Sequence, residues 1–202
     1  MNGKRSSSGS WKKIASTVLV MCGLALLGYA GSEYWQMYRS QRELEVQWQN
    51  QMSAKVATER PLSAGDMLTR VSIPKISLDA IVVEGTAHKQ LAIGPGHIVE
   101  TAMPGEQGNA VITGHRDTFF RHIYELNKGD EILVRRNGQV FHYRVTGKKI
   151  VQPEDVSVLK QTSDAQLTLI TCYPIWYIGP APERLVVFSK LVESGATATA
   201  AN

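Results

Sequence analysis

Three side chains that together can support nucleophilic catalysis stand at the ends of apolar runs. Cys172 and His115 each follow such a run, and Arg184 begins one. A thiol near neutral pH is only a few per cent thiolate, and a neighbouring imidazole or guanidinium raises the reactive fraction. Arg184 has a permanent charge that suits it to holding a developing oxyanion or a peptide carbonyl. These residue types indicate thiol chemistry with an acid–base partner.

The local sequence places the thiol and the imidazole at strand ends. Cys172 comes directly after the apolar residues 167–171, and Pro174 stops that run two residues later. His115 comes directly after Gly114, a residue that permits an unusual backbone or a close approach by a neighbour. A rigid scaffold commonly presents functional side chains at such positions, so Cys172 and His115 can meet in space.

Cysteine usage is consistent with a free thiol. The chain has two cysteines. Cys22 lies inside an uncharged apolar segment, where we expect it to act as a small apolar residue. Cys172 then has no disulfide partner in its own domain, so it is either buried and inert or kept free for chemistry. The residues alone leave both interpretations open.

Metal ligation is not indicated. No HxxxH or CxxC spacing is present, and we expect no metal and no other cofactor. Four acidic residues of the body are not spaced as calcium ligands: Glu100, Glu106, Asp130 and Glu131. The remaining histidines show no pattern that separates them from ordinary surface or core positions: His88, His97, His122 and His142. Asp117 would share a face with His115 in a strand but not in a turn, so a role in orienting the imidazole stays open.

The body of the chain has the short apolar runs and frequent turn residues that are typical of an all-β protein. Gly, Pro and Asn separate short apolar runs that we predict to be strands: Thr69–Ile73, Leu78–Val83, Ala110–Thr113, Glu131–Val134, Val140–Val145, Gln166–Thr171 and Leu185–Leu191. The pair Asn137-Gly138 between two runs predicts a tight hairpin. Two short helices are expected at 118–126 and 153–159. This pattern predicts a small barrel or sandwich.

The N-terminal region predicts a membrane anchor. Residues 14–32 carry no charge, and as a helix they would be about 28 Å long, close to the roughly 30 Å of bilayer hydrocarbon. Basic residues precede this segment, which predicts a cytoplasmic N-terminus and an exported body. The alternative is a signal peptide cleaved after Ala30. Both interpretations export the rest of the chain.

A polar helix or linker follows the anchor. Leu44, Trp48, Met52 and Val56 recur on one helical face, which either packs on the chain's own domain or mediates self-association. Residues 61–65 break the pattern and mark a domain boundary. The expected organisation is a basic tail, an anchor, a juxtamembrane helix or linker, an exported domain and a flexible tail, at 1–13, 14–32, 33–62, 63–193 and 194–202.

Charge and composition exclude several classes of protein. The 43% hydrophobic and 20% charged composition is that of a globular protein, not of a disordered, collagen-like or polytopic membrane protein. The net charge of +4 is accounted for by Lys4, Arg5, Lys12 and Lys13, so the remainder is balanced. A balanced body makes nucleic acid an unsuitable partner.

Three separated motifs resemble the sortase family. Residues 168–172 read TLITC, which matches the TLxTC cysteine signature, and residues 114–117 read GHRD, which matches the histidine segment. Arg184 falls where the family has its arginine. The stretches at 94–98, 103–109 and 177–182 are most similar to class D sortases. The resemblance covers residues 68–192, the whole of the expected exported domain.

The resemblance implies a fold and an activity. The fold is a closed β-barrel of about eight strands with short helices. The activity is cleavage of an LPxTG-like C-terminal signal in a secreted protein, between Thr and Gly, by a membrane-anchored cysteine transpeptidase. The resemblance implies that Cys172 is the nucleophile, His115 the acid–base group and Arg184 the oxyanion or signal-binding group. Thr168 and Thr171 are expected to support the substrate or the oxyanion.

The resemblance also implies the reaction partners. They are the secreted protein and an acceptor amine from peptidoglycan, a pilin or another protein, while water as acceptor gives hydrolysis. Two other readings compete: an exported thiol endopeptidase, and a membrane-anchored scaffold with an idle triad. A peptidoglycan-type Cys/His transpeptidase would show an SxGC-like segment, which this sequence lacks.

Overall fold

A computed structural model describes residues 8–54 and 67–196 of the chain. The helices are α1 (Ser8–Ala54) and α2 (His88–Ile93), with short 3-10 helices η1 (Pro74–Ile76), η2 (Ile123–Glu125) and η3 (Val156–Leu159). The strands are β1 (Met67–Ile73), β2 (Leu78–Glu84), β3 (Gly96–His97), β4 (Gly108–Thr113), β5 (Glu131–Arg136), β6 (Gln139–Val151), β7 (Ala165–Tyr173) and β8 (Glu183–Ala196).

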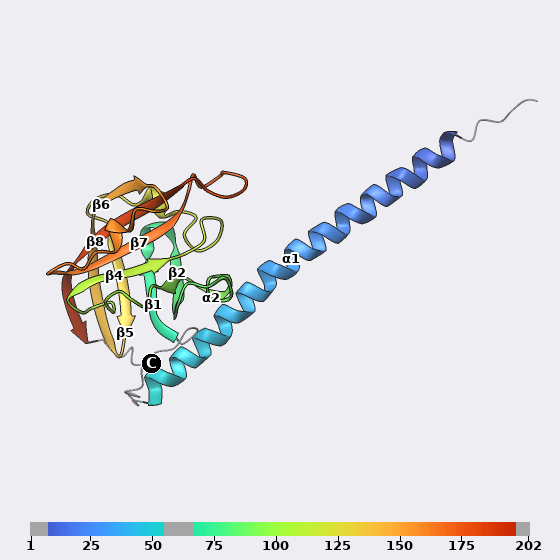
Figure 1. Ribbon diagram of the computed structural model, residues 1–202. Helices are drawn as coiled ribbons and strands as arrows, with labels where there is room; N and C mark the ends of the chain where they lie inside the picture. The colour runs from blue at the N-terminus through green and yellow to red at the C-terminus, as the bar shows by residue number, and fades with distance from the viewer. Residues whose placement is uncertain (1–7, 55–66, 197–202) are drawn as a thin grey trace, which may run out of the picture. The chain divides into compact units, whose positions relative to one another are not determined.

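The strands close into a barrel in the order β1-β2-β3-β4-β7-β8-β6-β5 (Figure 1). Closure comes from the pairing of β1 with β5. The pairs β2–β3 and β4–β7 are parallel, and the others are antiparallel. The prediction of a closed barrel of about eight strands is confirmed. The short strand β3 links β2 to β4 through only two residue pairs on each side.

The barrel is filled by apolar side chains that alternate along the strands, as expected when one face of each strand is buried. The side chains of this core include Val71, Ile73, Ala110, Ile112, Ile132, Val134, Tyr143, Leu167, Leu169 and Val187. Phe120, Ile123 and Leu126, from the segment after His115, belong to the same core. The segment that carries His115 is therefore fixed to the barrel by packing.

The predicted hairpin at Asn137-Gly138 joins β5 to β6. Asn137 has φ of 51° and Gly138 has φ of 74°. Both values lie in the left-handed region, which asparagine and glycine tolerate better than other residues. The turn sets the register in which Arg136 pairs with Gln139.

Three local features differ from the sequence-based expectation. Helix α2 and the two-residue strand β3 were not predicted. The expected helices at 118–126 and 153–159 contain only the short helices η2 and η3. Strand β8 runs to Ala196, three residues beyond the predicted end of the domain, because it pairs with the long strand β6 as far as Gln139.

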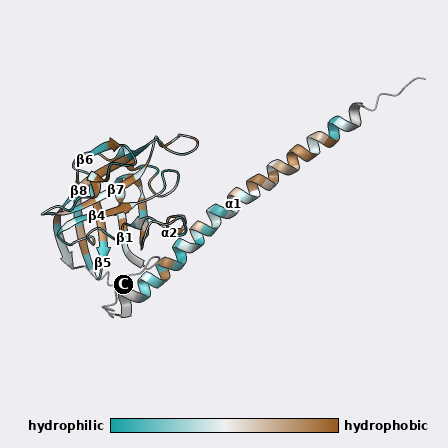
Figure 2. Ribbon diagram, viewed as in Figure 1, coloured by the Kyte–Doolittle hydropathy of each residue, from teal (hydrophilic) through white to brown (hydrophobic). Residues whose placement is uncertain are grey.

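Helix α1 is continuous over 47 residues. Its apolar portion, brown in Figure 2, is long enough to cross a membrane, with a mean hydropathy of 1.9 in its most apolar window. The chain divides into two compact units, Met1–Ser40 and Gln41–Asn202. The predicted boundary at 61–65 and Val56 lie outside the described residues.

The end of α1 that belongs to the second unit packs on the barrel. Leu44 is buried against Ile81 and Val83 of β2, with Trp48 beside them. The Gln41 side chain accepts a hydrogen bond from the Ile81 N–H at 3.1 Å, so it satisfies a backbone group that β3 does not reach. This packing supports the first of the two alternatives, in which the polar helix packs on its own domain.

A charged cluster reinforces the same contact. The Arg70 guanidinium of β1 forms two hydrogen bonds with the Asp79 carboxylate, at 2.8 and 2.6 Å, and one with Glu45 of α1 at 2.6 Å. The Arg70 guanidinium also lies 5.4 Å from the centroid of the Trp48 ring. The hydrogen bond with Asp79 raises the pKa of Arg70. Burial lowers this pKa, and the hydrogen bond with Glu45 raises it further, so the net change is upward.

Candidate active site

Strand pairing places Cys172 and Arg184 opposite each other. Cys172 near the end of β7 is in register with Arg184 near the start of β8. Their neighbours Tyr173 and Leu185 face the barrel core. Because successive side chains of a strand point to opposite faces, Cys172 and Arg184 lie on the outer face of this wall. The Cys172 thiol is free and partly exposed.

The histidine segment is joined to the cysteine strand by two hydrogen bonds. The Gly114 N–H donates to the Ile170 carbonyl at 3.1 Å, which extends the β4–β7 ladder by one residue. The Thr171 hydroxyl donates to the Gly114 carbonyl at 2.7 Å. Gly114, the residue before His115, therefore lies beside Thr171, the residue before Cys172. The structure thus places the segment that carries His115 beside the strand that carries Cys172.

Glycine is required at position 114 by packing. A Cβ atom there would lie 2.9 Å from the Phe120 ring, a fully buried core residue. That separation is well inside van der Waals contact, and an aromatic ring in a close-packed core has little room to move. Gly114 thus lets the chain turn tightly enough for the Phe120 N–H to donate to the His115 carbonyl at 3.0 Å.

One nitrogen of the Arg184 guanidinium is held by hydrogen bonds to nearby main-chain carbonyls. Its Nη1 donates to the Ala181 carbonyl at 3.2 Å and to the Glu183 carbonyl at 2.9 Å. No hydrogen bond of Nε or Nη2 occurs within residues 8–54 and 67–196. A guanidinium has five N–H donors, so those two nitrogens can serve an anionic or carbonyl oxygen at the outer face.

The imidazole of His115 has a neighbour that the sequence did not single out. The rings of His88 and His115 are 6.4 Å apart between centroids, with planes inclined by 63°. His88 begins helix α2, and nothing in its sequence context distinguished it from the other histidines. Asp117 is exposed, and no hydrogen bond joins it to His115 in the described part of the chain. The geometry places His88, rather than Asp117, next to the His115 ring.

Thr168 and Thr171 are buried, and both hydroxyls are used within the protein. Thr168 is fully buried, and its hydroxyl donates to the Asn109 side-chain oxygen at 2.7 Å. The Asn109 amide nitrogen in turn donates to the carbonyls of Val158 at 2.9 Å and Lys160 at 3.3 Å. Asn109 therefore ties the β6–β7 loop to the wall beneath the site. Sequence reasoning missed this residue because a lone asparagine in an apolar run has no distinctive pattern.

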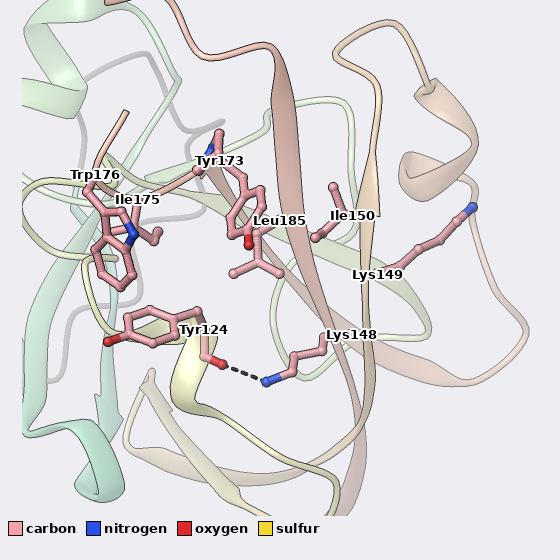
Figure 3. A pocket seen from close by; sticks show the side chains of 9 residues that line it. Tyr124, Lys148, Lys149, Ile150, Tyr173, Ile175, Trp176 and Leu185 are labelled. Atoms are coloured by element: carbon pink, nitrogen blue, oxygen red, sulfur yellow. Dashed lines mark hydrogen bonds between the residues drawn. The ribbon is translucent and has the colours of Figure 1, made fainter. Parts of the chain in front are cut away.

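A cavity of about 360 Å³ lies between β6, the start of β8 and the loop that follows β7 (Figure 3). Its lining is Tyr124, Lys148, Lys149, Ile150, Tyr173, Pro174, Ile175, Trp176 and Leu185. Tyr173 and Leu185 contribute the core-facing part of this lining. Lys148 Nζ donates to the Tyr124 carbonyl at 2.6 Å. Burial, followed by the hydrogen bond with Glu125, raises the pKa of Tyr124.

Several histidines and acidic side chains away from Cys172 have local partners. His97 is buried with Glu84, its Nδ1 lying 3.1 Å from the carboxylate. His122 and His142 contact Glu125 and Glu131 at 2.7 and 2.9 Å. Glu106 forms an ion pair with Arg136, and Asp130 forms one with Lys75. Within the described residues, no group of three or more His, Cys, Asp or Glu side chains is placed to hold a metal ion.

Comparison with known proteins places this geometry in a family. The sortase domain model matches residues 71–192, more than half of the chain. Sortase D of Bacillus subtilis is 32% identical over 202 residues, which covers 90% of this chain and 99% of that protein. The chain belongs to the sortase family.

Solved sortase structures share the fold. The Sortase D5 transpeptidase of Clostridium perfringens superposes with a TM-score of 0.69 at 28% identity, over 77% of this chain and 99% of that one. Sortase A of Listeria monocytogenes superposes with a TM-score of 0.60 at 25% identity, over 66% of this chain and 92% of that one. Sortases are generally cysteine transpeptidases. In this sortase the free thiol of Cys172 and the guanidinium of Arg184 lie on one wall of the barrel, beside the segment that carries His115.

Proposed function

We propose that this sortase cleaves an LPxTG-like sorting signal between Thr and Gly and transfers the new acyl end to an amine. The observation that carries the proposal is the register of Cys172 with Arg184 beside the segment that holds His115. These three groups supply a nucleophile, an oxyanion donor and a proton carrier on one exposed wall. Such a set suits acyl transfer through a covalent intermediate.

In the first half of the reaction, the Cys172 proton passes to His115, and the thiolate sulfur attacks the Thr carbonyl carbon. Nε or Nη2 of Arg184 donates to the oxygen that becomes negative. When the tetrahedral species collapses, the Thr–Gly C–N bond breaks, and His115 gives a proton to the departing glycine nitrogen. The products are a thioester on Cys172 and a free amine, so atoms and charge balance.

In the second half, an acceptor amine attacks the thioester carbon. His115 receives the proton that the amine loses, the C–S bond breaks, and a new amide forms as the sulfur is released. The acceptor amine belongs to peptidoglycan, a pilin or another protein. Water in place of the amine gives hydrolysis, which is the thiol endopeptidase alternative.

The apolar part of α1 supports a membrane location for this chemistry. We propose that residues 14–32 span the membrane once, that the N-terminus is cytoplasmic and that the barrel is exported. The basic residues before the segment favour this orientation. An enzyme held at the membrane meets secreted proteins as they emerge from it.

The experiment that tests the proposal uses the full-length chain in detergent with a panel of LPxTG-like peptides. Mass spectrometry measures a Thr thioester on Cys172, with and without an added amine, beside Cys172→Ala. We expect an adduct in the wild type alone, which the amine converts to a new amide. Conversion to free acid despite the amine would support the endopeptidase. The absence of any adduct, with a thiol inert to alkylation, would support the scaffold and refute the proposal.

A further inference from the structure

The loop between Cys172 and Arg184 directs three of its carbonyls at one side chain. Arg116 Nη1 donates to the Pro174 carbonyl at 3.2 Å. Its Nη2 donates to the carbonyls of Tyr177 and Gly179, each at 2.7 Å. Arg116 follows His115 directly in the sequence. One guanidinium thus connects the histidine segment to the loop that runs from the nucleophile strand to the arginine strand.

This contact requires an arginine. A guanidinium presents its N–H groups as a planar fork, so one side chain can reach three carbonyls that lie in different directions. The Arg116 guanidinium also lies 6.0 Å from the centroid of the Tyr177 ring. Within the described loop at 174–182, the backbone forms one hydrogen bond of its own, from the Tyr177 N–H to the Pro174 carbonyl at 3.3 Å. The loop therefore depends on Arg116 for most of its polar contacts.

A second contact holds the same loop to the same segment. The rings of Trp176 and Tyr124 meet edge to face, with centroids 5.4 Å apart and planes at 86° (Figure 3). Ile175 beside Trp176 is buried. Tyr124 belongs to η2, which follows His115 in the chain. The loop is thus attached to the histidine segment by polar contacts at Arg116 and by aromatic contacts at Tyr124.

We propose that Arg116 is a positioning residue that fixes the histidine segment relative to the acyl-enzyme site. Strand pairing already fixes Cys172 against Arg184, but it does not reach beyond Gly114 toward His115. Proton transfer to the leaving amine requires His115 to be within hydrogen-bond reach of the scissile nitrogen. The clamp formed by Arg116 holds that geometry by preventing the loop and the histidine segment from moving apart.

The kinetic test compares Arg116→Ala and Arg116→Lys with Arg121→Ala in the full-length protein. It rests on the proposed function, since it measures amide formation from a sorting-signal peptide. A displacement of about 1 Å in a reacting group reduces rate about 100-fold, so we expect kcat of Arg116→Ala to fall by that order while KM changes little. Arg121 is exposed in the same segment, so its removal should leave kcat unchanged.

Two further measurements separate positioning from general damage. Guanidinium ion added to Arg116→Ala should restore part of the lost kcat. The kcat of Arg116→Lys should stay below that of the wild type, because lysine lacks the planar set of N–H donors of a guanidinium. The rate of Cys172 alkylation at alkaline pH should equal that of the wild type, because the sheet positions the thiol. A kcat of Arg116→Ala equal to that of Arg121→Ala, or a slowed alkylation, would overturn the proposal.

Amide hydrogen exchange tests the clamp without any activity. In Arg116→Ala, the amides of residues 175–179 should exchange faster, whereas those of β7 and β8 should not change. Equal exchange in the wild type and the variant would refute the clamp. Faster exchange in the variant, together with a wild type that forms no thioester with any peptide, would uphold the clamp and refute the proposed function instead.

Discussion

The hydroxyl of Thr171 offers a sharp test of how the histidine segment is held. Thr171→Val replaces this hydroxyl by a methyl group of similar size in a side chain that is 1% exposed. The change removes the 2.7 Å hydrogen bond to the Gly114 carbonyl and leaves the backbone pairing of β7 in place. The perturbation therefore acts on one contact between the Cys172 strand and the His115 segment.

The magnitude follows from the burial of the carbonyl that loses its partner. A typical hydrogen bond contributes about 1 kcal/mol net, and a buried acceptor left unsatisfied costs about 1–3 kcal/mol. We therefore expect Thr171→Val to destabilise the barrel by about 1–2 kcal/mol, which lowers the midpoint of thermal unfolding by about 5 °C for a domain of this size. Movement of His115 should lower kcat about tenfold in addition.

Thr113 provides a matched control. Its hydroxyl donates to the Ile170 carbonyl at 3.1 Å, but that oxygen also accepts the Gly114 N–H. Thr113→Val therefore leaves no carbonyl unsatisfied and should change the unfolding midpoint by less than about 2 °C. Thr171→Ser keeps the donor and should retain most of kcat.

The assays are thermal unfolding followed by circular dichroism and amide formation measured well below both midpoints. If Thr171→Val and Thr113→Val lower the midpoint equally, the argument from the unsatisfied carbonyl is wrong. If Thr171→Val lowers the midpoint but retains full kcat, the Thr171 hydroxyl stabilises the barrel without positioning His115.

Two further predictions concern the loops around the site. Asn109→Ala removes the donor to the Val158 carbonyl, so limited proteolysis of the β6–β7 loop should be about tenfold faster than in the wild type, and equal rates would contradict this role. A hydrogen bond from Lys75, followed by one from the Asn127 N–H, lowers the pKa of Asp130. The folded carboxylate then binds fewer protons than the unfolded one, so its stabilising contribution is present at neutral pH and lost as pH falls through the folded pKa. The midpoint of thermal unfolding should decrease between about pH 5 and about pH 3, and this decrease should be smaller in Asp130→Asn than in the wild type. An equal decrease in both proteins would show that Asp130 does not contribute to it.

The parts of the fold that depend on local pattern were predictable from the sequence. Alternating apolar runs located seven of the eight strands. Asn137-Gly138 located the β5–β6 turn because few other residues tolerate two successive positive φ values. Strand β3 could not be predicted, since two residues, Gly96 and His97, are too short to show alternation. Its pairing with β2 and β4 is a tertiary contact, which no local pattern encodes.

The candidate site was predictable to the same degree. Cys172, His115 and Arg184 stand at strand ends, where their spacing and motifs pointed to them. The contacts that hold them did not leave a local signal. Arg116 reaches the β7–β8 loop, and Asn109 reaches the β6–β7 loop, through side chains whose partners lie more than forty residues away in the chain. Thr171 was predicted to support the substrate or the oxyanion, and its buried hydroxyl suggests support of the histidine segment instead.

The three reactive groups are held by interactions of different kinds, and this difference has a functional consequence. Backbone pairing between β7 and β8 fixes Cys172 and Arg184, so substitutions elsewhere cannot easily separate them. His115 lies beyond the end of the ladder and is held by the packing of Phe120 in the core and by side-chain hydrogen bonds from Thr171 and Arg116 to main-chain carbonyls. Variants that reduce acyl transfer without unfolding the barrel should therefore concentrate at these side-chain contacts.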